Sequence, residues 1–267
     1  MLPPLCIYHR HCPDGLAAAC VVRRAFPDQV DFLPASYGDA PPDVTGREVV
    51  IVDFSYSRPD LEIMAAQAAG LTILGRQISE KDTISDLRGA ITVFHLGLSG
   101  ATLAWRYFFN DLPAPQLLRH IEDHALGLFR LEETRAVVAG LMSHPYDSRI
   151  YDYWMSHDSL APLAADGTAI LRQRKRDLDE LLPEVTRTMT IGGFTVPVAN
   201  LPPTLADDAL EILAKDQYFA ATYSDGQRLR RFILRSLAPN GIDVSVIAMR
   251  LGGSGGKHAA EFRIYRP

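Results

Sequence analysis

The chain has 267 residues, enough for one large or two ordinary domains with a hydrophobic core. Its hydrophobic fraction of 47% and charged fraction of 22% are typical of globular proteins, and its net charge of −5 argues against a broad basic surface for nucleic acid. The three cysteines show no paired spacing, the N-terminus lacks a signal-peptide pattern, and no apolar run reaches the ~18 residues that a membrane span needs. We therefore expect a cytoplasmic protein without a disulfide framework or a membrane partner.

The first distinctive segment is a polar turn between a short strand and a helix. Residues 5–7 form an apolar run that predicts a buried strand, and the alanine-rich segment that ends near Phe26 has helical spacing. In an α/β sheet such a turn lies at the carboxyl end of its strand, where ligands usually bind. Two interpretations are open: a set of metal ligands, or a capped helix with surface histidines. The side chains concerned are His9, His11, Cys12 and Asp14.

The segments that follow continue to alternate between strands and helices. The unbroken β-branched run at 48–52 is typical of a strand buried on both faces, and it ends at Asp53. Repeated βαβ units of this kind predict a mostly parallel sheet flanked by helices. The predicted strands cover residues 30–36, 48–52, 71–74 and 91–94, and the predicted helices cover 58–69 and the segment from a Ser99 cap through Phe109.

The remainder of the chain is expected to divide into a helical region, a linker and a second domain. Residues 112–157 have helical patterning and contain Asp123 beside His124. Residues 165–187 carry alternating charges over a leucine stripe, which indicates an exposed connecting helix. The last third predicts a smaller α+β domain: a hairpin around Gly192-Gly193, a helix at 205–215, strands at 218–223 and 229–237, a helix at 242–251, a glycine loop at 252–258 and a final strand at 262–265.

Several motifs occur in one order along the chain, and that order resembles the DHH phosphoesterase superfamily, in which a catalytic domain precedes a DHH-associated domain. The similarity covers nearly the whole chain and is closest to the branch whose first motif reads His-x-Asp-Cys-Pro-Asp-Gly. It implies two-metal hydrolysis of phosphoester or phosphoanhydride bonds, commonly with manganese, and domains at 1–164 and 189–267 joined by a connecting helix at 165–188. The motifs are His9–Gly15, Val52-Asp53-Phe54-Ser55, Ser99-Gly100-Ala101, Ile121-Glu122-Asp123, Arg235-Ser236 and the loop Gly252–Phe262.

The resemblance also implies roles for individual side chains. Asp53 would bridge two metal ions, His9 and Asp14 would each hold one of them, and Asp123 would supply a further carboxylate. Each carboxylate also has a purely structural explanation. Asp14 could cap a helix, Asp53 could accept hydrogen bonds from turn amides, and Asp123 could be a solvated residue on a helix. The residues that would hold the substrate are Arg235, Ser236, Gly252, Gly253, Gly255, Lys257 and His258. The alternative for this last set is an ordinary loop between a helix and a strand.

The chain departs from the family at its name-giving motif. After the strand at 71–74, Gly75-Arg76-Gln77 replaces Asp-His-His and offers no metal ligand, and His11 stands at the position of an inner aspartate. We therefore expect at most one divalent ion, Mn²⁺ or Mg²⁺, or none, with Arg76 in the vacated metal position holding phosphate by its charge. The candidate ligands for such an ion are His9, His11, Asp14, Asp53 and Asp123.

Two functions stay open on these grounds. The first is a phosphohydrolase with a reduced metal site, using Asp53, Asp123 and Arg76, that acts on a nucleotide, a short oligonucleotide or another phosphate ester in the cleft between its domains. The second is a catalytically inactive relative that binds such a ligand. A weaker third hypothesis is a structural zinc ion at His9, His11 and Cys12 with one remote ligand. The expected partner is a small phosphorylated ligand or a short nucleic acid, and a homodimer is compatible with the sequence.

Overall fold

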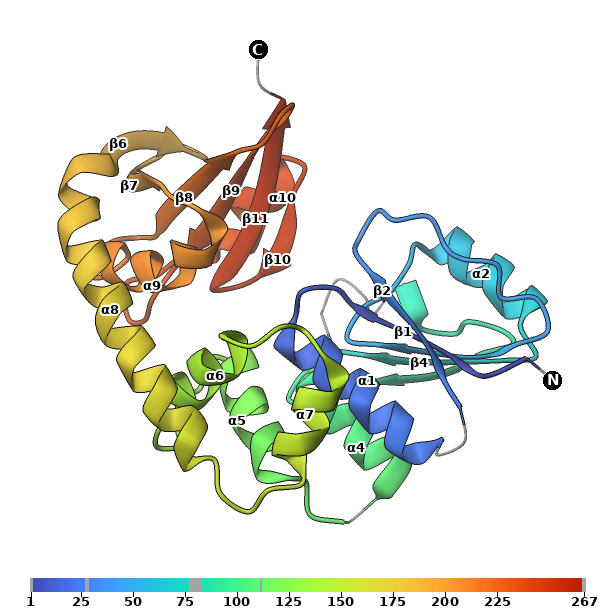
Figure 1. The fold of residues 1–267 in the computed structure, drawn as a ribbon. Helices are drawn as coiled ribbons and strands as arrows, with labels where there is room; N and C mark the ends of the chain where they lie inside the picture. The colour runs from blue at the N-terminus through green and yellow to red at the C-terminus, as the bar shows by residue number, and fades with distance from the viewer. Residues whose placement is uncertain (1, 27–28, 77–82, 111, 266–267) are drawn as a thin grey trace. The chain divides into compact units, whose positions relative to one another are not determined.

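The computed structural model describes residues 2–26, 29–76, 83–110 and 112–265 (Figure 1). The chain divides into two compact units, Met1–Ile170 and Leu171–Pro267. The boundary lies inside helix α8 (Ala161–Val185), which covers most of the predicted connecting segment. None of the described helices is both long enough and apolar enough to span a membrane.

The first unit is built on a parallel five-stranded sheet with the order β2-β1-β3-β4-β5. Each pair of neighbouring strands is parallel, so the α/β prediction for this part of the chain is confirmed. The β-branched run predicted to be buried forms β3, which lies between β1 and β4. The strands are β1 (Leu5–His9), β2 (Asp31–Ala35), β3 (Glu48–Val52), β4 (Gly70–Gly75) and β5 (Ile91–Phe94).

Helices cover both faces of this sheet (Figure 1). Helix α2 (Arg58–Gln67) lies on one face, where Leu61 and Met64 join the apolar side chains of β1, β3 and β4. Helices α1 (Pro13–Ala25) and α4 (Gly100–Phe109) lie on the other face. Helices α5 (Gln116–Ala125) and α7 (Ser148–Met155) pack against α1, and α6 (Thr134–Met142) packs against α5. Pro13 opens α1, and the Ser99 hydroxyl accepts the Thr102 amide, so the predicted cap of α4 is confirmed.

Helices α6 and α8 cross at two glycines that allow their backbones to approach closely. A Cβ atom at Gly167 would lie 1.7 Å from the Ala136 carbonyl oxygen, and one at Gly140 would lie 2.1 Å from the Leu163 carbonyl oxygen. We expect Gly167→Ala to lower the free energy of unfolding by about 2–3 kcal/mol, because rigid backbone must move to admit the methyl group. Denaturant titration measures this loss, and Ala165→Ser on the exposed face of α8 is the control. Equal denaturant midpoints for Gly167→Ala and the parent would contradict the close approach of the α6 and α8 backbones.

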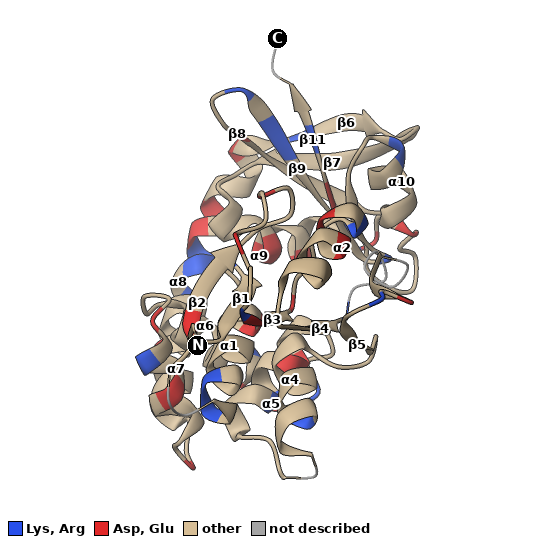
Figure 2. Ribbon diagram, turned by 90° about the vertical axis from the view of Figure 1, so that its right-hand side faces the viewer, with Lys and Arg blue, Asp and Glu red and all other residues tan. Residues whose placement is uncertain are grey.

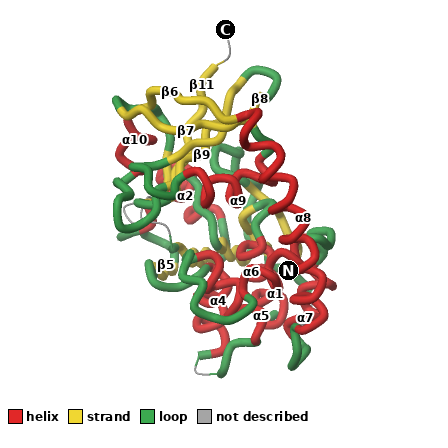
Figure 3. Tube along the Cα trace, turned by 90° about the vertical axis from the view of Figure 1, so that its left-hand side faces the viewer, coloured by secondary structure: helices red, strands yellow, loops and turns green. Residues whose placement is uncertain are grey.

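The second unit contains a six-stranded mixed sheet with the order β10-β11-β9-β8-β7-β6. Figure 3 shows α9 (Pro203–Leu213) and the end of α8 on one side of these strands and α10 (Val244–Arg250) on the other. The hairpin of β6 and β7 turns at Gly192-Gly193, as predicted. The smaller second domain is therefore confirmed as a mixture of helices and strands. Its strands are β6 (Thr186–Ile191), β7 (Phe194–Asn200), β8 (Ala220–Asp225), β9 (Leu229–Arg235), β10 (Ser254–Gly256) and β11 (Ala259–Tyr265).

The glycine-rich segment near the C-terminus differs from its prediction. A loop was expected throughout 252–258, which is wrong for Ser254–Gly256, because these residues form β10 and pair antiparallel with β11. A Cβ atom at Gly253 would lie 2.0 Å from the Glu261 carbonyl oxygen. The glycines therefore have a packing role, since they let this short strand lie against β11.

Charged residues of both signs are distributed along the ribbon of α8 (Figure 2). Lys175 pairs with Asp179 and Arg176 with Glu180, each four residues apart and exposed. On the opposite side of the helix, Leu178 is buried in an apolar cluster with α9. This is the amphipathic pattern that the sequence predicted for the segment.

Candidate functional site

The candidate site lies in the first unit, at the carboxyl ends of β1, β3 and β4. In the order β2-β1-β3-β4-β5, the chain adds β2 on one side of β1 and then β3, β4 and β5 on the other side, so the topological switch point lies between β1 and β3. Open parallel sheets bind ligands at such a switch point, outside the carboxyl ends of the strands. Cys12 caps the start of α1 after β1, and Asp14 lies in the first turn of that helix. Asp53 follows β3 directly, and Arg76 follows β4. Neighbouring parallel strands thus bring together side chains that are far apart in sequence.

Asp14 is buried and holds the start of a helix. Its two carboxylate oxygens accept hydrogen bonds from the backbone amides of Gly100 and Ala101, both at 2.8 Å. These amides belong to the first turn of α4 and have no partner within the helix. The structural alternative named for Asp14 was a helix cap, and the helix that this side chain caps is α4 rather than α1. Both of its oxygens are therefore already engaged.

Arg76 links the two buried carboxylates. Its Nε lies 2.7 Å from Asp53 Oδ1 and 3.2 Å from Asp14 Oδ2. Burial disfavours the charged guanidinium, but the negative charges of Asp53 and Asp14 outweigh this effect and raise the pKa of Arg76 further. A fixed positive charge therefore lies between the two carboxylates.

The two aspartates respond differently to this environment. Burial, followed by the negative charge of Asp53, raises the pKa of Asp14 to about 7, against the lowering effect of Arg76. Burial also opposes the ionisation of Asp53, but His9 and Arg76 overcome it and hold the pKa of Asp53 below its ordinary value. Of the two, Asp53 is the carboxyl group whose surroundings favour the ionised form. Its φ of 54° is a left-handed conformation that is uncommon outside glycine and clusters at functional sites.

Asp53 and two neighbouring side chains, His9 and Cys12, form the group among the described residues that is best arranged to hold a single metal ion. Cys12 Sγ donates a hydrogen bond to Asp53 Oδ2 at 3.3 Å, and His9 Nδ1 lies 3.8 Å from the same oxygen. The ligand atoms of the three residues all lie within 4.8 Å of one another. One nitrogen, one sulfur and one oxygen donor suit Zn²⁺ better than Mn²⁺ or Mg²⁺, which prefer oxygen ligands. Burial raises the pKa of the Cys12 thiol well above its ordinary value, so metal binding would have to displace its proton.

The residues described do not fit the pair of metal ions that the sequence resemblance implies. Asp14 is committed to the amides of α4, and Arg76 occupies the space beside Asp53 Oδ1. A second dication would lie against this guanidinium and would repel it. The side chains therefore suit at most one ion, on the His9 side of Asp53.

Two further predicted ligands lie apart from this group. The His11 ring packs edge-on against the Tyr146 ring, with their centroids 5.7 Å apart, and its carbonyl oxygen accepts the Tyr146 hydroxyl. Asp123 accepts hydrogen bonds from the amides of the loop that follows α5 and from the Thr134 hydroxyl, at 2.6–3.0 Å. The Asp123 carboxylate thus holds together the loop that connects α5 to α6. Gln77, which completes the replaced motif, lies outside the described residues.

In the second unit, two of the predicted substrate-holding residues, Ser236 and His258, are in contact just after β9. Ser236 Oγ lies 3.0 Å from His258 Nδ1, and the Ser236 amide donates to the His258 carbonyl oxygen at 3.1 Å. The Arg235 guanidinium has no hydrogen-bond or ion-pair partner among the residues that the structure describes, and Lys257 is exposed. Gly253, just before β10, and Gly255, within it, lie so close to β11 that a Cβ atom at either would collide with its backbone, whereas Gly252 has open space around it.

Sequence reasoning missed the part that His120 and Thr134 play beside Asp123. The sequence drew attention to His124 because it follows Asp123 directly, but the His124 ring packs edge-on against Phe129. His120 instead lies 3.0 Å from the Thr134 hydroxyl, which donates to Asp123. The available signal was helical spacing, since residues three positions apart share one face of a helix.

The chain was compared with family models, curated proteins and solved structures. No family model matches the chain. Among curated proteins the chain is similar to the uncharacterized protein R106 of Acanthamoeba polyphaga mimivirus, with 21% identity over 277 residues. The alignment covers 95% of this chain but 66% of that relative, so the chain spans slightly less than two thirds of the relative's length.

Among solved structures, two similar ones each cover 99% of the chain. The pGpG-specific phosphodiesterase PggH from Vibrio cholerae has a TM-score of 0.51 at 11% identity, with 99% of this chain and 94% of that chain covered. An uncharacterized protein from Helicobacter pylori has a TM-score of 0.41 at 11% identity, with the same coverage. The likeness to PggH extends over both units and establishes the fold.

Proposed function

Because the chain has the DHH-like phosphoesterase fold of PggH, we propose that it binds a phosphate ester at the carboxyl ends of β1, β3 and β4. The ligand is a nucleotide, a short oligonucleotide or a related small phosphorylated molecule. The two-metal centre of the fold family is degraded in this chain, and Arg76 supplies the positive charge in its place. Arg235 and Ser236 of the second unit are the proposed substrate-holding pair.

The observation that carries this proposal is the position of Arg76 between Asp14 and Asp53, at 3.2 and 2.7 Å. A guanidinium is permanently charged, so Arg76 can offset the negative charge of the two carboxylates where a metal ion would otherwise do so. It cannot activate water, which is why binding without turnover is the function that this geometry favours.

The second unit adds independent support. The Arg235 guanidinium has no partner among the described side chains, and it lies next in sequence to the buried Ser236, which is bonded to His258. An arginine without a carboxylate partner is available for a phosphate group, because it does not have to give up an ion pair first.

We expect Arg235→Ala to weaken the binding of a linear dinucleotide by roughly tenfold, the value of one charge-assisted hydrogen bond pair. pGpG, the substrate in the name of PggH, is the first probe, with guanosine monophosphate and phosphate-free guanosine as comparisons. Calorimetric titration of the full chain gives the affinities. Arg176→Ala, which removes an exposed arginine of α8, is the matched control and should bind like the parent. Unchanged affinity in Arg235→Ala would count against the proposed pair.

A second candidate function is metal-dependent hydrolysis of the same ligand class. The grouping of His9, Cys12 and Asp53 within 4.8 Å favours it, because these residues can hold one ion. One divalent ion at this place would supply an activated water and a positive charge for the phosphoryl group. Incubation of pGpG with the chain and Zn²⁺, Mn²⁺ or Mg²⁺ separates the two candidates. Products that disappear in Asp53→Asn would favour the hydrolase, and bound but intact pGpG with every ion would favour the binding protein.

A further inference from the structure

A polar pocket lies in the first unit between α4, α5 and the connection that joins them, and it shares no residue with the candidate functional site. Its volume is about 660 Å³, which is within the usual range for small-molecule sites. Its lining includes Trp105, Arg106, Leu112, Arg119 and Glu122. Three of these side chains are charged, so the pocket suits an ionic ligand.

Two guanidinium groups supply the positive charge of this pocket. Arg106 lies in the last turn of α4 and Arg119 in α5, so the two groups come from different helices. Both side chains are exposed, and neither forms a hydrogen bond or an ion pair with any residue that the structure describes. A ligand therefore meets both charges without first having to break an ion pair.

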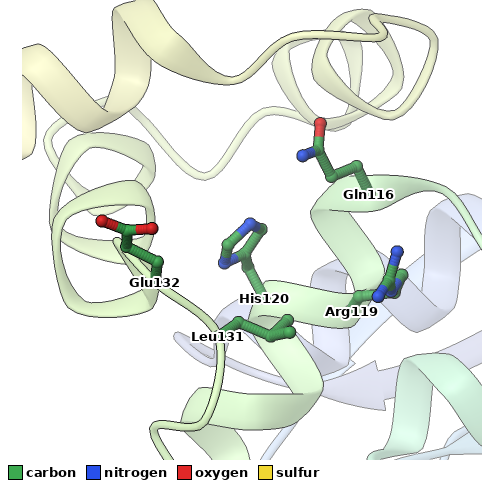
Figure 4. Close-up of a pocket in the computed structure, with 5 residues that line it drawn as sticks. All are labelled: Gln116, Arg119, His120, Leu131 and Glu132. Atoms are coloured by element: carbon green, nitrogen blue, oxygen red, sulfur yellow. The ribbon is translucent and has the colours of Figure 1, made fainter.

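Arg119 also borders a smaller pocket of about 190 Å³, which is drawn in Figure 4. In that view the side chains of Arg119 and His120 leave α5 in different directions. Glu132 lines the smaller pocket, but no ion pair joins it to Arg119 among the described side chains. Glu132 therefore does not neutralise the charge that Arg119 brings to the larger pocket.

Glu122 is the one carboxylate in the described lining of the larger pocket. Its Oε1 atom accepts the backbone amide of Ser99 at 3.3 Å, and no ion pair within the described segments joins it to either arginine. Two positive charges and one negative charge leave the described lining with a net charge of +1, on a chain whose net charge is −5. This local excess of positive charge favours an anionic ligand.

Trp105 holds the wall of the pocket in place. Its side chain is 8% exposed, and its indole N–H donates a hydrogen bond to the Leu112 carbonyl oxygen at 2.8 Å. The indole also packs against the Phe109 ring, with their centroids 4.5 Å apart. These contacts fix the connection after α4 against the helix, so a ligand spends little binding energy on ordering this wall.

We infer that this pocket binds a small organic anion with two charged oxygen groups, each a phosphate or a carboxylate, one at Arg106 and one at Arg119. A guanidinium can donate two parallel hydrogen bonds to either kind of group. The inference does not depend on the proposed phosphate site and stands if no phosphate ester binds there.

The test is calorimetric titration of the full chain with methylenediphosphonate and with succinate, which carry two phosphonate and two carboxylate groups. The one that binds more tightly identifies the anionic group that the pocket takes. We expect Arg106→Gln and Arg119→Gln each to lower the affinity roughly tenfold, because each removes one charge-assisted hydrogen-bond pair. Glu122→Gln keeps an acceptor for the Ser99 amide but removes the opposing charge, so it should raise the affinity about threefold. Arg172→Gln, at an exposed position of α8, is the matched control and should bind like the parent.

The two tryptophans of the chain provide a readout that is specific for this pocket. Trp105 lines it, whereas Trp154 lies in α7. The ¹H–¹⁵N spectrum therefore contains two indole resonances, which Trp154→Phe assigns. The anion should shift the Trp105 resonance along the calorimetric binding curve and leave that of Trp154 in place.

The same readout separates this pocket from the proposed phosphate site, because an anion bound only there would not move the Trp105 resonance. A Trp105 resonance that stays in place with both anions would overturn the inference. Equal affinities for the parent and either Arg106→Gln or Arg119→Gln would also overturn it. Both arginines are exposed, so these variants should keep the fold of the parent.

Discussion

Replacement of Arg76 by alanine is expected to destabilise the first unit and, at the same time, to create a binding site for a divalent cation. The substitution removes the guanidinium that lies 2.7 Å from Asp53 and 3.2 Å from Asp14. Two buried carboxyl groups then face each other without a counter-charge, which costs about 3–5 kcal/mol of unfolding free energy. A dication can take the vacated space, so Mn²⁺ should restore part of this loss by binding the folded state.

The measurement is the free energy of unfolding, by denaturant titration, for the parent and Arg76→Ala with and without Mn²⁺. Arg176→Ala is the control, because its exposed ion pair with Glu180 contributes little. Mn²⁺ should raise the free energy of unfolding of Arg76→Ala more than that of Arg176→Ala or the parent. If Arg76→Ala is as stable as the parent, or if Mn²⁺ gives it no added stability, then Arg76 does not act as the cation of this site.

The second large effect is expected for Asp123→Asn, which keeps the shape of the side chain but removes its charge. The carboxylate accepts the amides of Arg130 and Leu131 and the Thr134 hydroxyl. An asparagine has one acceptor oxygen, so its NH₂ group must face at least one of these donors. We expect a loss of about 3 kcal/mol of unfolding free energy at pH 7, the scale of hydrogen bonds to a charged group.

The same variant should also change how stability depends on pH. Burial opposes the ionisation of Asp123, but the Thr134 hydroxyl and the two amides hold its pKa below the ordinary 3.8. The unfolded chain therefore binds this proton more tightly than the folded chain does, so the contribution of Asp123 is present above pH 3.8 and is lost as the pH falls through the folded-state pKa. The difference between parent and Asp123→Asn should shrink below about pH 4. Asp158→Asn, at an exposed position, should show no such trend.

Local patterns were sufficient to predict most of the fold. The β-branched residues of β3 and the alternation of strands with helices predict a parallel sheet, because that sheet must be buried on both faces. The segment 252–258 was harder, since glycine is typical of loops. Its strand forms because β11 offers a backbone edge at close range, and that edge comes from residues whose position the local sequence does not reveal.

The candidate site was predictable only as a location. The ends of β1 and β3 could be identified from the chain, because parallel strands deliver their carboxyl ends to one edge of the sheet. The partners of each carboxylate could not. Which amides Asp14 accepts depends on how α4 packs, and the loop that Asp123 closes depends on the turn after α5. These are long-range or loop-specific contacts, and residue type alone does not encode them.

The bonds from Asp14 to α4 bear on how the first unit assembles. They join positions 86 and 87 residues apart, so the first turn of α4 is completed only when the N-terminal strand and helix are in place. Closing so long a loop costs entropy that local structure does not repay, and this favours all-or-none folding of the segment between them. A fragment that began after α1 would lack Asp14 and would leave these two buried amides without acceptors, so we expect such a fragment not to fold on its own.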